Sequence, residues 1–170
     1  NYEKKDEYNK IILDSKQISK KKRNEAYKLL QKLKKNKIIN YYLGMASVKE
    51  IDNLNILEAT KLSMKRVVDK FKLSDVTLII DGNFRLKHKN YIEKSIIRGD
   101  RKSISIAAAS IIAKIHRDRI MSILSTKFTN FKWNENSGYG TKKHIMEIRD
   151  KGATIHHRKS FEPVKSMLNF

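Results

Sequence analysis

Two aspartates stand beside predicted ordered segments, where carboxylates can hold a divalent cation. Asp81 comes directly after the run Val76–Ile80, and Asp100 ends the tetrapeptide Ile97-Arg98-Gly99-Asp100. In open α/β sheets, functional groups gather beyond the carboxyl ends of the strands. Hard oxygen ligands of this kind favour Mg²⁺ or Mn²⁺. From position alone, two interpretations of Asp81 have equal weight: a metal ligand, or a loop residue that caps the following turn.

A third aspartate, Asp118, lies on a predicted helix between Arg117 and Arg119. Either Asp100 or Asp118 could supply a second ligand. We expect Asp118 to form an ion pair with its flanking arginines, whereas Asp100 has the freer loop setting. Two carboxylates in a basic protein suggest phosphodiester chemistry with two metal ions about 3.5–4 Å apart.

Three further residues are candidates for substrate contact. Ser15 and Lys16 precede a predicted helix whose N-terminus could help Lys16 to hold a phosphate, although an ordinary helix cap with an exposed lysine is favoured without further context. Tyr139 stands between Gly138 and Gly140. Glycine neighbours let the ring project and stack on a sugar or base, and we favour this over a ring folded onto the core.

Near the carboxyl end, the run His156-His157-Arg158-Lys159 is densely polar. Zinc binding is not expected, because adjacent histidines point in different directions and no other ligand pair has metal spacing. Phosphate contact and structural packing both remain open for this run.

The charge of the chain points to a polyanionic partner. Its 170 residues carry 38 Lys and Arg against 18 Asp and Glu, a net charge of +20. Nucleic acid is the usual partner of such a protein, although codon bias toward lysine is an alternative source of the charge. The absence of cysteine excludes disulfides and thiolate metal sites. No apolar run approaches the roughly 18 residues of a membrane span, so we expect a cytoplasmic protein.

The hydrophobic pattern alternates predicted strands with predicted helices, which indicates an α/β or α+β layered fold. Helices are expected from Ser19 to about Lys35, from Asn55 to about Lys72, from Ala107 to about Lys127 and from Thr141 to Gly152. Strands are expected at Ile38–Val48, at Val76–Ile80 with both faces buried, and at Ser103–Ile106. Neither repeats nor a linker interrupt this pattern.

These motifs together resemble ribonuclease HII, the type 2 ribonuclease H. They fall in the order found in that family and cover nearly all of the chain from Asp14 onward. The matching segments are Asp-Ser-Lys at 14–16, Glu-Ile-Asp-Asn-Leu-Asn-Ile-Leu-Glu-Ala-Thr at 50–60, Ile-Ile-Asp-Gly-Asn at 79–83, Gly-Asp at 99–100, Ser-Ile-Ala-Ala-Ala-Ser-Ile-Ile-Ala-Lys at 105–114, Arg-Asp-Arg at 117–119, Gly-Tyr-Gly-Thr at 138–141 and His-His-Arg-Lys-Ser-Phe at 156–161.

The resemblance implies a fold and an activity. The fold is an α/β ribonuclease H-like mixed sheet flanked by helices, with a helical C-terminal part, in a single domain over residues 1–170. The activity is endonucleolytic cleavage of the RNA strand of RNA–DNA hybrids, and incision at single ribonucleotides in duplex DNA, with Mn²⁺ or Mg²⁺ as cofactor. These two nucleic acids are the implied partners of a monomer that binds no membrane.

The resemblance also assigns roles to residues. The third and fourth catalytic, metal-binding carboxylates of the family map onto Asp81 and Asp100, and its junction-sensing tyrosine maps onto Tyr139. Ser15 and Lys16 match its phosphate-contact segment, where the family often has Asn in place of Leu13. Asp118 matches a family position that we interpret as structural.

One motif of the family does not occur. The family opens with a strand bearing Asp-Glu-x-Gly-Arg-Gly, which supplies two of four carboxylates, and residues 1–13 hold nothing like it. We therefore expect an N-terminally incomplete domain that lacks one or more strands and is weak or inactive alone. Four carboxylates balance two divalent ions, whereas two leave them under-liganded. A non-catalytic, basic nucleic-acid-binding remnant is the alternative interpretation.

Overall fold

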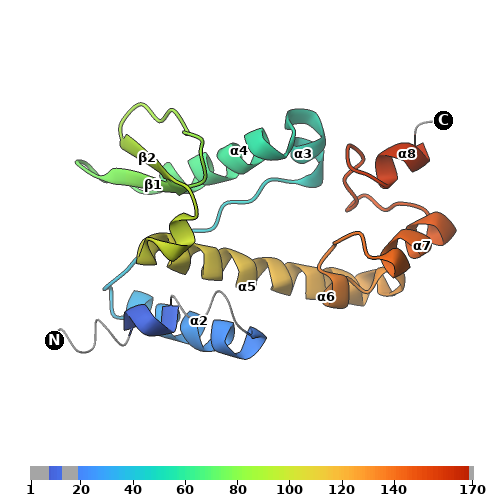
Figure 1. Cartoon of the computed structure of the whole chain (residues 1–170), viewed down its shortest axis with the longest axis horizontal. Coiled ribbons are helices and arrows are strands. Elements are labelled where there is room, and N and C mark those ends of the chain that lie inside the picture. Colours follow the sequence, from blue (N-terminus) through green and yellow to red (C-terminus); the bar gives the residue numbers. More distant parts are fainter. Residues whose placement is uncertain (1–7, 13–18, 169–170) are drawn as a thin grey trace. The chain divides into compact units, whose positions relative to one another are not determined.

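The computed structural model of the chain describes residues 8–12 and 19–168 (Figure 1). Residues 8–12 form a short helix. The elements that follow are α2 (Lys20–Lys35), α3 (Val48–Leu54), α4 (Ile56–Val68), β1 (Thr77–Asp81), β2 (Ile92–Ile96), η1 (Gly99–Arg101), α5 (Ile104–Lys127), η2 (Thr129–Phe131), α6 (Trp133–Asn136), α7 (Lys142–Lys151) and α8 (Val164–Leu168). The mixed α/β class with a helical C-terminal part is confirmed.

The chain divides into two compact units. The first comprises residues 1–43 and 69–116, and the second comprises residues 44–68 and 117–170. The long helix α5 crosses from one unit to the other at residues 116 and 117. Each unit has its own core of buried side chains.

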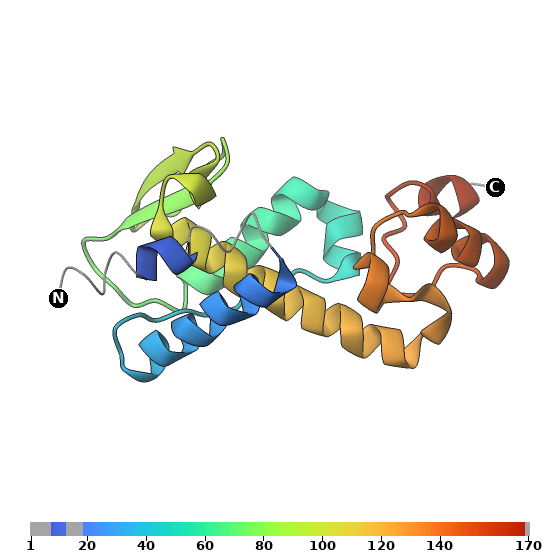
Figure 2. The same cartoon turned by 60° about the horizontal axis from the view of Figure 1, so that its bottom comes forward.

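The core of the first unit lies between α2 and the first half of α5, which run alongside each other (Figures 1 and 2). Ala26 and Ala107 are fully buried and allow the two helices to approach closely. Leu30 and Ile111 fill the space beside them, each 1% exposed. Burial of a side chain of this size stabilises a fold by about 1.5–3 kcal/mol, so this pairing anchors the unit.

The sheet of the described residues consists of β1 and β2, paired in parallel. Thr77 lies opposite Ile92 and Asp81 lies opposite Ile96. The apolar run predicted this strand correctly within one residue at each end. The prediction that both faces of this strand are buried is wrong for the described residues, because Thr77 is exposed and Ile79 is 36% exposed.

Two other predicted strands are wrong. Residues 39–47 lie outside regular elements, and α3 begins at Val48. Their β-branched and aromatic composition favours a strand, but a strand also needs a hydrogen-bonded neighbour, and the described part of the chain provides none. At Ser103, the Gly99 carbonyl accepts the Ser103 N–H at 2.8 Å and the Ser103 carbonyl accepts from Ala107. These bonds lead the chain directly into α5.

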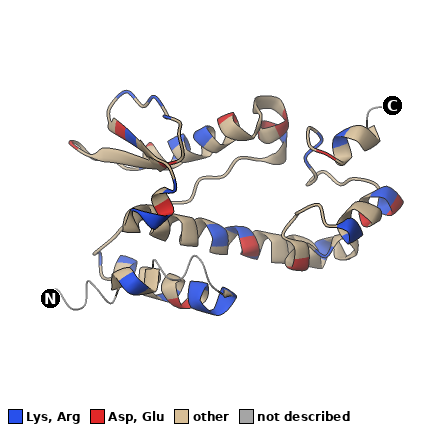
Figure 3. Ribbon diagram, in the orientation of Figure 1, with Lys and Arg blue, Asp and Glu red and all other residues tan. Residues whose placement is uncertain are grey.

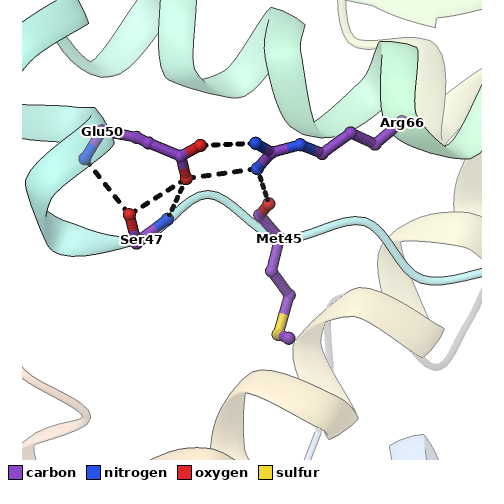
Figure 4. Close-up of polar contacts among 4 residues, drawn as sticks. All are labelled: Met45, Ser47, Glu50 and Arg66. Atoms are coloured by element: carbon purple, nitrogen blue, oxygen red, sulfur yellow. Dashed lines mark hydrogen bonds and ion pairs between the residues drawn. The ribbon is translucent and has the colours of Figure 1, made fainter.

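In the second unit, α3 and α4 form a helical hairpin that a polar network holds (Figure 4). Ser47 caps α3, and the Glu50 carboxylate accepts hydrogen bonds from the Ser47 N–H at 2.8 Å and hydroxyl at 3.0 Å. Arg66 of α4 forms a bidentate pair with the same carboxylate and also donates to the Met45 carbonyl at 2.7 Å. The Arg66 hydrogen bonds, followed by those from Ser47, lower the pKa of Glu50 to about 2.

The second unit also contains an aromatic core that includes two buried histidines. Phe131 and Trp133 stack at 5.3 Å between ring centroids, and His144 stacks on His157 at the same separation. The His157 Nδ1 accepts the Thr154 N–H at 2.9 Å. Burial, and then the neighbouring His144, lower the pKa of His157 to about 4.

Gly44 provides a test of the packing in the second unit. A Cβ atom at this position would lie 2.1 Å from the Ser63 carbonyl oxygen and 2.7 Å from Val67 Cγ2. We expect Gly44→Ala to lower the free energy of unfolding by about 1–3 kcal/mol, because the backbone of α4 must move. Urea denaturation measures this, and Gly140→Ala, whose Cβ meets nothing closer than 3.9 Å, is the control. Equal stabilities of the two variants would contradict the packing.

His157 makes the stability of the chain depend on pH. Its folded pKa of about 4 lies below the unfolded value of about 6.5, so the unfolded state binds more protons between these values. Stability is therefore fully present above pH 6.5 and is lost as the pH falls toward 4, by about 2–3 kcal/mol. Thermal unfolding of wild type and His157→Gln across this range should show the steeper slope in wild type. Identical slopes would refute the assignment to His157.

Candidate active site

Asp81 is the last residue of β1, at the carboxyl edge of the two-stranded sheet. The chain leaves the sheet immediately after it, where the Gly82 N–H donates to the Ile96 carbonyl at 3.1 Å. Gly82 adopts φ +126°, a conformation that side-chain-bearing residues rarely take. The strand pairing therefore fixes the backbone of Asp81 on both sides.

A hydrogen bond joins Asp81 to the segment that carries Asp100. The Gly99 N–H donates to Asp81 Oδ1 at 2.9 Å, and Asp100 is the next residue, within η1. The Gly99 carbonyl accepts from both Lys102 and Ser103 at the start of the path into α5. The structure thus brings the end of β1, with Asp81, against the turn that carries Asp100, and both aspartates are half-buried.

The donor atoms at this edge suit a hard divalent cation, because carboxylate oxygens are the ligands that Mg²⁺ and Mn²⁺ prefer. The hydrogen bond from Gly99 engages Asp81 Oδ1 and gives the carboxylate a fixed orientation. Among the described residues, no group of three or more His, Asp or Glu side chains could hold a metal ion. The carboxylates of Asp81 and Asp100 are therefore the right type of ligand for such a metal, and further ligands are needed to complete its coordination.

The remaining acidic and N-terminal candidates lie elsewhere. Asp118 is half-buried on α5 in the second unit, and its predicted ion pair with the flanking arginines stays a prediction. Ser15 and Lys16 lie outside the described residues, so their predicted phosphate contact also stays a prediction.

Tyr139 lies on an ordered turn in the second unit and projects from it. Its N–H donates to the Asn136 carbonyl and its carbonyl accepts from Thr141, at 2.9 and 2.8 Å. The side chain is 66% exposed. Gly138, with φ +77°, provides the backbone conformation that the turn requires. The turn with an exposed ring agrees with the expectation from the glycine neighbours, and the Thr141 side chain caps α7 as predicted.

Two arginines of the second unit, Arg117 and Arg158, interact electrostatically with each other, and Arg158 belongs to the run for which the sequence left phosphate contact open. Arg117 Nη2 donates to the Ser137 carbonyl at 3.0 Å, which holds the turn before Tyr139. Arg158 lies over the Phe161 ring at 3.7 Å. Burial, and then the positive charge of Arg117, lower the pKa of Arg158.

Asp52 positions the segment that bears Arg158. Its carboxylate accepts the Lys159 N–H at 3.0 Å, the Ser160 N–H at 2.9 Å and the Ser160 hydroxyl at 2.6 Å. Its partial burial opposes ionisation, but the hydrogen bonds from Ser160 and Lys159 outweigh this and lower the pKa of Asp52. The negative charge of Asp52 is thus directed at the backbone.

Comparison with known families gives one match over most of the chain. The family model described as Ribonuclease HII matches residues 3–164. Several curated proteins named Ribonuclease HII are also similar to the chain over about nine tenths of its length.

Three of these relatives show the extent of the similarity. The Macrococcus caseolyticus protein is 48% identical over 155 residues, which is 91% of this chain and 56% of the relative. The Pelagibacter ubique protein is 46% identical, over 94% of this chain and 83% of its own length. The Orientia tsutsugamushi (strain Ikeda) protein is 47% identical, over 89% of this chain and 70% of its own length. The chain thus spans little more than half of the first of these relatives.

Substitutions at Asp81 separate its structural contribution from its charge. Asp81→Ala removes the acceptor of the Gly99 N–H and should lower the free energy of unfolding by about 1–2 kcal/mol. Asp81→Asn keeps an oxygen acceptor for the Gly99 N–H and should lower the free energy of unfolding by clearly less. Chemical denaturation of both variants measures the difference. A stability of Asp81→Ala equal to that of wild type would contradict a structural role for the hydrogen bond.

Proposed function

The chain belongs to the ribonuclease HII family, and we propose that it carries the chemistry of a metal-dependent endonuclease. Its substrates are the RNA strand of RNA–DNA hybrids and single ribonucleotides embedded in duplex DNA. The observation that supports this proposal most is the hydrogen bond from Gly99 to Asp81, which places Asp81 and Asp100 at one sheet edge. Carboxylates so arranged suit phosphodiester hydrolysis better than any other chemistry the chain offers.

In this proposal, Asp81 and Asp100 are the metal-binding, catalytic carboxylates. Mg²⁺ or Mn²⁺, when bound in a two-ion site, supplies Lewis-acid stabilisation of the phosphate and an activated water. The chain contributes orientation: Gly99 fixes one oxygen of Asp81, and the turn into α5 fixes the backbone of Asp100. The Asp81 carboxylate is therefore already oriented when the substrate arrives.

Tyr139 and the two arginines are the proposed substrate contacts of the second unit. The exposed ring of Tyr139 can stack on a sugar or base beside a 2′-OH, and Arg117 and Arg158 can neutralise phosphates. Ser15 and Lys16 are proposed to contact a further phosphate.

We also propose that the protein acts as a cytoplasmic monomer and that residues 1–170 form one domain of the family. In the described residues, no helix is long and apolar enough to span a membrane.

A second candidate function is binding without cleavage. It is favoured by the small number of ligands, since the described residues provide no group of three or more metal-binding side chains. Two carboxylates carry −2 against the +4 of two divalent ions, so the affinity for metal should be low. We therefore propose that the 170-residue chain alone is weak in catalysis and that an Asp-Glu-x-Gly-Arg-Gly segment completes the site.

The cleavage test uses labelled duplex DNA with one embedded ribonucleotide, in Mn²⁺ and then in Mg²⁺. The chain fused behind an Asp-Glu-x-Gly-Arg-Gly segment should incise on the 5′ side of the ribonucleotide, and the unfused chain should be slower by at least 100-fold. Asp81→Asn and Asp100→Asn in the fused protein should each abolish incision, because each removes a metal-binding charge.

Asp118→Asn in the fused protein is the matched control, since it removes the same charge from α5, and it should retain most of the activity. Cleavage by Asp81→Asn at the wild-type rate would refute the assignment. Tight, salt-sensitive binding by the fused protein without any incision would instead support the non-catalytic alternative.

A further inference from the structure

The loop between β1 and β2 presents cations on one side. Its side chains alternate in burial from residue 84 to residue 89. The side chains that turn toward the protein are those of Phe84, Leu86 and His88, and the exposed ones are those of Arg85, Lys87 and Lys89. We define the exposed three as the loop cations. Figure 3 shows this basic loop above the two strands.

The side chains of β2 hold the backbone of this loop in place. The Glu93 carboxylate accepts three successive N–H groups, from Leu86, Lys87 and His88, at 2.8, 3.2 and 2.6 Å. The Ser95 hydroxyl donates to the Phe84 carbonyl at 2.5 Å. Glu93 and Ser95 are two residues apart on β2 and point to the same face, so the loop lies along that face.

A second set of contacts ties the far end of the loop to residues 69–71. His88 Nε2 lies 3.2 Å from Asp69 Oδ1, and the Tyr91 hydroxyl donates to the Phe71 carbonyl at 2.8 Å. The His88 and Tyr91 rings stack at 4.7 Å. A loop held at so many points loses little conformational entropy when a ligand docks on it.

The charge of this region is strongly positive, and its main local compensation is the attraction between Arg85 and Glu93. Residues 82–102 contain seven Lys and Arg and two acidic residues, Glu93 and Asp100. Desolvation opposes ionisation of Glu93, but its three backbone hydrogen bonds outweigh this and lower its pKa, so its negative charge serves the loop backbone. Within the described part of the chain, none of the loop cations forms an ion pair with a carboxylate within 4 Å.

Lys87 has the left-handed backbone conformation, with φ +56°. This conformation is unfavourable for a residue with a Cβ, and glycine or asparagine adopts it more readily. The Glu93 hydrogen bonds maintain it, and the lysine side chain consequently projects from the outer side of the turn.

We propose that Arg85, Lys87 and Lys89 form a contact surface for the phosphate backbone of a nucleic-acid duplex, separate from the carboxylates of Asp81 and Asp100. The proposal rests on the proposed function in that it concerns the same substrate. The loop begins just after Asp81 and lies along β2 at Ser95 and Glu93, so the surface engages the same duplex at phosphates other than the scissile one. Such contacts fix position without reading sequence.

The test measures binding of fluorescent duplex DNA with one embedded ribonucleotide, by anisotropy, in EDTA so that no cleavage occurs. The triple variant Arg85→Gln, Lys87→Asn, Lys89→Gln should lower the slope of log affinity against log salt by about 2–3, since each phosphate contact contributes about 0.9. Affinity at low salt should fall at least tenfold. Each single variant should lower the slope by about 1, and Lys87→Asn does so at a position where asparagine relieves backbone strain.

The matched control is Lys20→Gln, Lys21→Gln, Lys22→Gln, which removes the same charge from the exposed first turn of α2. We expect it to change the slope by less than 1. Equal loss of slope in both triple variants, or an unchanged slope in the loop variant, would overturn the proposed surface. Either result is compatible with salt-dependent duplex binding by the wild type, and so with the proposed function. Absence of salt-dependent duplex binding by the wild type would overturn the proposed function together with the surface.

Discussion

The hydrogen bond between the Gly99 N–H and Asp81 Oδ1 connects the strand that ends at Asp81 with the turn that carries Asp100. Parallel pairing of β1 with β2 brings the ends of both strands to one edge, and this bond then sets the direction of the Asp81 carboxylate. The same turn starts α5, whose first half packs on α2. The geometry of the carboxylates is thereby coupled to the most buried part of the first unit.

The chain uses several of its carboxylates to organise its own backbone. Glu50, Asp52 and Glu93 each accept backbone N–H groups, and the pKa of each is lowered. These amide contacts occupy oxygen lone pairs that would otherwise accept from lysines and arginines, and Glu50 pairs with Arg66 in addition. A protein with a net charge of +20 can in this way fold compactly and still present cations to a polyanion.

Local signals in the sequence predicted several elements correctly, because the start and end of these elements depend on residues close by in the sequence. The apolar run before Asp81 predicted β1, and Thr141 with Gly152 predicted the ends of α7. The prediction at 38–48 was wrong because a strand depends on a partner far away in the chain. The loop cations were likewise not assigned, because the role of a lysine or arginine depends on which carboxylates fold against it. Glycine neighbours did identify the exposed Tyr139, and the motif order identified the family.

The carboxylate pair can be examined most directly through Mn²⁺-induced broadening of backbone amide NMR signals in the 170-residue chain. Paramagnetic broadening depends on distance from the ion, and it needs neither catalysis nor tight binding. We predict that the amides of Gly82 and of Gly99–Arg101 broaden at the lowest Mn²⁺ concentrations, and that Asp81→Asn abolishes this preference. Broadening that begins elsewhere in the chain, or that is unchanged in Asp81→Asn, would contradict a metal site at the edge formed by Asp81 and Asp100.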